Sequence, residues 1–185
     1  MEDFSTRNIM VSGNMLLMRL LEEMDEKKVS FGIFNKGLLN YYGVMVGLDG
    51  ASYEGEMLNG KKHGKGILRN PKKEYYYEGE FKDGYRWGYG TEFVGKGASY
   101  KGEFVRNLKE GEGNLVTSEY KYEGSFKKNK FHGYGKCVWK DKRQYEGQWE
   151  AGYRHGFGTF SWPDGRVYKG KVHSCRPIQS RQEVR

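Results

Sequence analysis

The sequence has little of several features on which globular and membrane proteins commonly depend. Only 36% of the 185 residues are hydrophobic, and the apolar run MLLM near the start ends at Arg19. A helix that spans a membrane needs about 20 apolar residues, so we expect none. Two cysteines, Cys137 and Cys175, and three prolines are too few for a disulfide framework or a proline-rich tract. With acidic Glu2 and Asp3 where a signal peptide carries positive charge, we expect an intracellular protein, either soluble or peripherally attached.

The chain is instead rich in glycine and in aromatic residues. It contains 28 glycines, and 16% of its residues are Phe, Trp or Tyr. Both kinds gather in stretches such as YEGEFKDGYRWGYG, residues 77–90. We therefore expect apolar burial to come mainly from rings rather than from Leu, Ile and Val.

This stretch recurs along the chain with a spacing of 22 to 24 residues. Well-matched copies begin at tyrosines 53, 77, 100, 122 and 145, a degenerate copy begins near Ser30, and a truncated copy begins at Tyr168. A narrow, repeated spacing is typical of stacked repeat arrays. We therefore predict an array over residues 30–172, preceded by a segment of residues 1–29 and followed by a tail of residues 173–185.

Turn residues predict the structure of each copy. Asn59-Gly60, Asp83-Gly84 and Ala151-Gly152 occupy one repeat position, with Asn107 and Asn129 in the remaining copies. Glycine and asparagine tolerate the positive φ of tight hairpin turns. Each copy is thus predicted to be a β-hairpin with a first strand Tyr-x-Gly-x-Phe and a second strand that opens with Gly-x-Gly. Because glycine weakens a strand unless something approaches it closely, we expect rings to lie over these glycines, namely Phe34, Phe81, Phe104, Phe126 and Trp149.

The pattern Tyr-Glu-Gly-x-Trp/Phe-x-x-Gly-x-x-x-Gly-x-Gly resembles the MORN (membrane occupation and recognition nexus) repeat. The resemblance implies an all-β fold, an elongated single-layer array of antiparallel β-hairpins. MORN proteins include components of ciliary axonemes such as radial-spoke heads, other cytoskeletal proteins, junctional proteins and plant lipid kinases. It thus implies either a scaffold for partner proteins or a contact with lipid.

The ends of the array carry two further predictions. Residues 14–28 place Leu17, Leu20, Leu21 and Met24 on one helical face, which predicts an amphipathic N-terminal α-helix. This helix would cap the first hairpin, dock on a partner, or do both. The basic tail of residues 173–185 is expected to become ordered only on a partner.

Residues that suggest catalysis or metal binding follow the repeat instead. His63, His132 and His155 hold one repeat position, which Trp87 and Glu110 fill in other copies, so we expect them to be spread along the array rather than to form a metal site. The glutamates after the leading tyrosines, for example Glu54 and Glu146, are expected to form a row that pairs with nearby Lys or Arg. We predict a non-enzyme without cofactor.

A basic stretch is the candidate for binding an acidic surface. Residues 121–143 carry eight Lys or Arg against two acids, within a chain of net charge +8. The basic candidates are Lys121, Lys127, Lys128, Lys130, Lys136, Lys140, Lys142 and Arg143. Such a stretch is suited to bind tubulin, another acidic protein, anionic lipid or nucleic acid. The alternative is that it is a solvated face that binds no partner and only keeps the array soluble. Nucleic acid is the least favoured because the aromatic residues are already needed for the stack.

The sequence is compatible with two functions. The first is a structural scaffold that binds partner proteins in a cytoskeletal assembly, with a cilium or flagellum axoneme as the location that the resemblance favours. Its candidate anchors are the ring edges of Tyr85, Trp87, Tyr89, Tyr134, Tyr153 and Phe157. The second is a peripheral tether that binds anionic phospholipids through the basic stretch.

Overall fold

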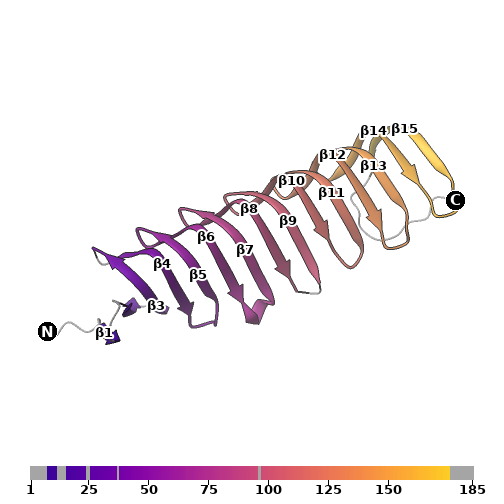
Figure 1. Cartoon of the computed structure of the whole chain (residues 1–185). Helices are drawn as coiled ribbons and strands as arrows, with labels where there is room; N and C mark the ends of the chain where they lie inside the picture. Colours follow the sequence, from indigo (N-terminus) through magenta and orange to yellow (C-terminus); the bar gives the residue numbers. More distant parts are fainter. Residues whose placement is uncertain (1–7, 12–15, 24–25, 37, 96, 176–185) are drawn as a thin grey trace. The chain divides into compact units, whose positions relative to one another are not determined.

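The structure is a computed structural model that describes residues 8–11, 16–23, 26–36, 38–95 and 97–175. The chain divides into two compact units, Met1–Gly95 with Val105–Asn107, and Lys96–Phe104 with Leu108–Arg185. Each unit is an antiparallel sheet in which the strands pair in sequence order, as Figure 1 shows hairpin by hairpin. The predicted all-β array of antiparallel hairpins is confirmed.

The strands follow the copies of the repeat. The first unit holds β1 (Asn8–Val11), β2 (Leu16–Glu23), β3 (Glu26–Asn35), β4 (Leu38–Gly47), β5 (Ser52–Leu58), β6 (Lys61–Asn70), a short 3-10 helix (Pro71–Lys73), β7 (Tyr75–Lys82) and β8 (Tyr85–Val94). The second holds β9 (Ala98–Val105, whose last residue belongs to the first unit), β10 (Leu108–Val116), β11 (Tyr120–Lys127), β12 (Lys130–Trp139), β13 (Gln144–Glu150), β14 (Tyr153–Ser161) and β15 (Val167–Cys175).

Two-residue turns close the hairpins as predicted. Both residues of the turn have positive φ, for example 50° and 74° at Asn59-Gly60 and 51° and 90° at Asp83-Gly84. This backbone matches the right-handed twist of the flanking strands, which is why Asn, Asp and Gly recur here. The same pair of positive φ values occurs at Lys128-Asn129, where Asn129 supplies the tolerant residue.

The leading tyrosines form the core of both units. Tyr53, Tyr77, Tyr100, Tyr122 and Tyr145 are between 0% and 2% exposed. Each hydroxyl donates to the backbone carbonyl three residues later, at 2.7 to 3.0 Å. Where a ring follows four residues after the tyrosine, it packs edge-on with a centroid distance of 5.1 Å, as Trp149 does against Tyr145.

Rings cover glycines as expected, but the ring in closest contact is the tyrosine. A β-carbon at Gly158 would lie 2.5 Å from the hydroxyl oxygen of Tyr145. The rings predicted for this role, such as Phe81 and Phe126, pack against the tyrosine edges instead. Trp149 also reaches a glycine backbone, because its indole N–H donates to the Gly135 carbonyl at 3.0 Å. The tyrosine phenol is longer than Phe, so it reaches across to the second strand and still finds a hydrogen-bond acceptor.

The predicted N-terminal helix is wrong for the described residues in its range. Residues 16–23 form β2 and residues 26–28 begin β3, and these two strands pair from Leu17 opposite Gly32 to Glu23 opposite Glu26. The neighbouring strand offers backbone partners that the helical pattern of apolar residues did not reveal, so tertiary pairing overrides the local preference. Residues 14–15 and 24–25 lie outside the described residues. At the other end β15 reaches Cys175, three residues into the predicted tail, and residues 176–185 lie outside the described part.

Candidate functional site

The face of each sheet opposite the buried tyrosines, called the open face below, carries a row of exposed rings. The row consists of the residue just before the second glycine of Gly-x-Gly. It includes Tyr42 and Tyr89 in the first unit, 53% and 51% exposed, and Tyr134 and Phe157 in the second, 60% and 67% exposed. Because Gly90 and Gly135 are buried, the alternation of the strand directs Tyr89 and Tyr134 to the open face. Lys65 and Glu112 hold the same position in the remaining copies.

A side chain from the first strand holds the backbone of two of the outward rings, Tyr89 and Phe157, in place. Glu80 accepts a hydrogen bond from the Tyr89 backbone N–H at 3.1 Å, and Gln148 accepts one from Phe157 N–H at 2.9 Å. These side chains fold over the first glycine of Gly-x-Gly, because a β-carbon at Gly88 would lie 2.5 Å from the Glu80 carboxylate. Gly88 has a φ of 61°, so its backbone also favours glycine. This role was not predicted, although Glu or Gln recurs at this position, as Glu56, Glu80, Glu103 and Gln148.

The row of glutamates fixes the orientation of two of the exposed rings. The Tyr42 hydroxyl donates to Glu54 at 3.1 Å, and the Tyr134 hydroxyl donates to Glu146 at 3.3 Å. The hydrogen bond to the Glu54 carboxylate raises the pKa of the Tyr42 hydroxyl. The predicted pairing with basic residues is confirmed for Glu54 with Arg69 at 3.7 Å, and for Glu146 with Lys136 at 3.8 Å. Rings held in this way lose less conformational entropy when a partner binds.

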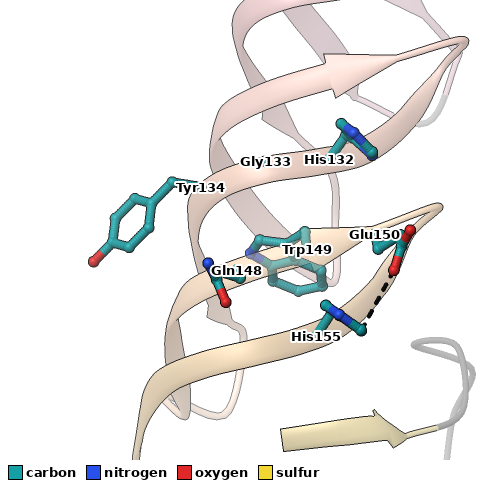
Figure 2. Close-up of a pocket in the computed structure, with 7 residues that line it drawn as sticks. All are labelled: His132, Gly133, Tyr134, Gln148, Trp149, Glu150 and His155. Atoms are coloured by element: carbon teal, nitrogen blue, oxygen red, sulfur yellow. Dashed lines mark ion pairs between the residues drawn. The ribbon is translucent and has the colours of Figure 1, made fainter. Parts of the chain in front are cut away.

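Two depressions lie at equivalent places of two copies, and each is lined in part by a core residue, Trp149 or Met57. The one in the second unit has a volume of about 510 Å³ and is lined by His132, Gly133, Tyr134, Gln148, Trp149, Glu150 and His155 (Figure 2). The one in the first unit has a volume of about 390 Å³ and is lined by Asn40, Tyr41, Glu56, Met57, Leu58, Asn59 and His63. The repeat therefore builds the same concavity next to an exposed ring in each unit.

The histidines lie closer together than expected in one case. His132 and His155 sit on the strands on either side of Trp149 and line the same depression (Figure 2). The His155 Nδ1 atom is 3.4 Å from a carboxylate oxygen of Glu150. Among the residues that the structure describes, no three His, Cys, Asp or Glu side chains are grouped as ligands of a metal ion would be.

The six predicted anchors separate into three groups. Tyr89, Tyr134 and Phe157 belong to the exposed row of the open face. Tyr85 and Tyr153, 48% and 39% exposed, begin second strands directly after the hairpin turns.

Trp87 differs from the other anchors because it is half-buried. The Lys82 ammonium lies 5.1 Å from the centre of its ring. Tyr42, an exposed ring of the same row, was not among the predicted anchors because the first copy lacks the leading tyrosine.

The predicted basic stretch is not one surface. Lys127, Lys128 and Lys130 surround the turn between β11 and β12, and all three are exposed. Lys140, Lys142 and Arg143 surround the next turn, which lies at the other end of β12. Arg143 is paired with Asp141 at 2.7 Å, and Lys136 points to the open face beside Glu146. Consecutive turns of a meander lie at opposite ends of the strands, so sequence proximity overstated the charge density.

One buried polar cluster was not predicted. The Arg86 guanidinium pairs with the Glu92 carboxylate, whose residue is 5% exposed. The Tyr75 hydroxyl lies beside both, accepting from Arg86 at 2.7 Å and donating to Glu92 at 3.1 Å. The core positions of Arg86 and Glu92 are filled by Phe131 and Cys137 in the copy that begins at Tyr122. Buried ion pairs tend to be costly to break by removing one partner.

Within the described parts of the chain, no helix has the length and apolar character needed to cross a bilayer.

Comparisons with known proteins agree with this repeat. A family profile described as MORN repeat matches residues 53–73, 77–96, 100–117, 122–142 and 145–165, which together make up more than half of the chain. MORN repeat-containing protein 3 of Xenopus laevis is 34% identical over 90 residues. These residues are 48% of this chain and 30% of that protein.

Proposed function

The chain belongs to the MORN-repeat family, and we propose that it is a non-enzymatic scaffold that binds segments of partner proteins across its open face. The observation that carries this proposal is the row of exposed rings, from 51% to 67% exposed, beside repeated depressions. Tyrosine and phenylalanine are enriched in protein interfaces, where anchors fill pockets near the centre.

The depressions favour a side-chain anchor from a partner over a small-molecule substrate. The larger one is lined by Trp149 and by polar groups of Gln148, Glu150 and His155, and the Tyr134 ring points outward beside them (Figure 2). An apolar side chain of a helix or extended peptide would pack against this outward ring, while its backbone reaches the polar groups of the depression. The equivalent depression in the first unit offers the same combination around Tyr41 and Glu56.

A variant of the second unit tests the proposal. Replacing Tyr134 and Phe157 by serine removes the exposed rings but touches no core contact. We expect partner binding to fall at least about tenfold, which corresponds to 1.4 kcal/mol, while unfolding free energy changes by less than about 0.5 kcal/mol. The matched control replaces exposed Lys121 and Ser118, on β11 and the connector before it, by alanine. Equal losses of binding and stability in the ring variant would contradict the proposal.

The assembly that contains the scaffold is proposed to be cytoskeletal, with a cilium or flagellum axoneme as the favoured case. This part of the proposal is supported only by the resemblance to axonemal and cytoskeletal MORN proteins. The test is extraction of cells with non-ionic detergent. Retention in the insoluble cytoskeletal pellet supports the proposal, whereas release together with membrane lipids contradicts it.

Binding to anionic lipid is the second candidate function. The observation in its favour is the exposed turn with Lys127, Lys128 and Lys130. Near an anionic surface each suitably placed lysine contributes about 1 kcal/mol. Changing these three residues to glutamate should abolish sedimentation with vesicles that contain phosphatidylserine, whereas the same change at Lys140 and Lys142 should have a smaller effect. Unchanged sedimentation of the first variant would exclude this function for that turn.

A further inference from the structure

The last described strand carries an incomplete copy of the repeat. In the part of the chain that the structure describes, β15 pairs with β14 and with no strand on its outer side. Its leading tyrosine, Tyr168, is 47% exposed, whereas the five complete copies bury theirs to between 0% and 2%. Among the described residues, a first strand is therefore present without the second strand that covers it in the complete copies.

β15 already has the local geometry of a complete copy. The Tyr168 hydroxyl donates to the Lys171 carbonyl at 3.2 Å, as the other leading tyrosines do three residues on. A β-carbon at Gly170 would meet atoms of Tyr168 first, at 2.6, 2.9 and 3.4 Å. At the equivalent Gly147 it would meet the backbone of the second strand, with the Gly158 Cα at 2.5 Å. The edge is thus preorganised for one more strand.

We propose that the outer edge of β15 binds an extended acidic segment of a partner protein, which adds a strand with a glycine opposite Gly170. The glycine is required because the leading tyrosine occupies the space of a side chain on the incoming strand. In the complete copy, a β-carbon at Gly158 would lie 2.5 Å from the Tyr145 hydroxyl oxygen and 2.6 Å from its ring. The same ring at Tyr168 would reject any residue with a β-carbon at that place.

The lysines of β15 indicate which residues should flank the glycine of the incoming strand. Lys169 and Lys171 flank Gly170 and are both exposed, where the preceding copy has Glu146 and Gln148. In the copy that begins at Tyr122, the cross-strand neighbour of this position carries the complementary charge, since Glu123 lies opposite Lys136. An incoming strand is therefore expected to carry Asp or Glu opposite Lys169. An apolar residue would follow opposite Tyr168, where Phe160 lies opposite Tyr145 in the complete copy.

The same charges argue against a second copy of this chain as the occupant. Two β15 strands could pair antiparallel with Gly170 opposite Gly170. Lys169 of each copy would then lie opposite Lys171 of the other, and directly opposed like charges are destabilising. Lysines on an edge strand also commonly prevent self-association.

A labelled synthetic peptide with Glu-Gly-Glu-Val at its centre tests the proposal by fluorescence anisotropy with the full chain. We expect saturable binding that weakens about tenfold or more when the peptide glycine becomes alanine, because steric overlap of this kind is costly. Exchanging Lys169 and Lys171 for glutamate should cause a similar loss, and a peptide with lysine in place of glutamate should restore binding to that variant. The control exchanges Lys121 and Lys127 for glutamate, which changes net charge equally and should leave binding intact.

Three results would overturn the proposal. Equal affinity for the glycine and alanine peptides would show that no strand is added under Tyr168. An equal loss in the control variant would show attraction to net charge alone. A concentration-dependent dimer that Tyr168→Arg dissociates would make a second copy the occupant. The open-face variant of Tyr134 and Phe157 should still bind the peptide, so this proposal and the proposed function fail separately.

Discussion

Gly158 provides the sharpest test of how the repeat is built, because a tyrosine ring occupies the place of its side chain. Its β-carbon would lie 2.5 Å from the Tyr145 hydroxyl oxygen and 2.6 Å from two ring carbons, far inside normal contact distance. Alanine at this position must therefore displace the ring from the core. Overpacking of this kind costs about 1 to 3 kcal/mol.

The backbone at Gly158 has the opposite effect on stability, because alanine is favourable there. Gly158 is not in the positive-φ region, so alanine fits its backbone and should gain about 0.4 to 1 kcal/mol by restricting the unfolded chain. The net effect of Gly158→Ala is thus a loss of about 1 to 2 kcal/mol. In a Tyr145→Ala background the clash is absent, and the same substitution should be neutral or stabilising by about 0.5 kcal/mol.

A double-mutant cycle measured by urea denaturation separates these terms. Trp149, whose ring centre is 5.1 Å from that of Tyr145, provides the fluorescence signal, with circular dichroism as a second probe. We expect a coupling free energy of about 2 kcal/mol between the two positions, well above the variation for independent sites. Additivity within about 0.5 kcal/mol would refute the explanation that glycine is required by the ring.

Three further predictions concern the core and the open face. Arg86→Met should cost about 3 to 5 kcal/mol because Glu92 loses a buried ion pair, and the added change Glu92→Leu should recover most of it in urea denaturation. Burial raises the pKa of the Cys137 thiol from about 9 to about 12. In a variant with serine at Cys175, a thiol reagent at pH 8 should therefore react with Cys137 only after unfolding. The free energy of unfolding should fall as the pH rises from about 9 to about 12, because the unfolded chain loses this proton first. Glu56→Ala should cost about 1 kcal/mol by removing the acceptor of a backbone hydrogen bond, whereas Glu54→Ala, an exposed ion-pair change, should cost less than about 0.5 kcal/mol.

The sequence predicted what the repeat itself specifies. Its period located the hairpins, and the asparagines and glycines located turns that have positive φ, as at Asn59. It also indicated that rings lie over glycines, but not that the phenol of Tyr145 rather than the indole of Trp149 covers Gly158. That choice depends on reach and on a hydrogen-bond acceptor across the turn, which a one-dimensional pattern does not display.

Other features depend on spatial neighbours and were beyond the sequence. Residues 16–23 have a helical pattern, yet β3 provides a pairing partner that favours a strand. The pairing of Arg86 with Glu92 requires both side chains to face the same core, although the two residues are only six apart. The basic residues of 121–143 seemed contiguous, but alternate turns of the meander separate Lys127 from Lys140.

Site-specific photo-crosslinking in cells tests most directly that the open face binds a partner. A photoreactive phenylalanine analogue would replace Tyr134 on the open face and, in a separate variant, Ser118 at an exposed turn of the same unit. The account predicts discrete protein crosslinks from position 134 that position 118 does not give, and their loss when Phe157 of the same unit is changed to serine. Equal protein crosslinks from both positions, or crosslinks from position 134 to lipid alone, would contradict it.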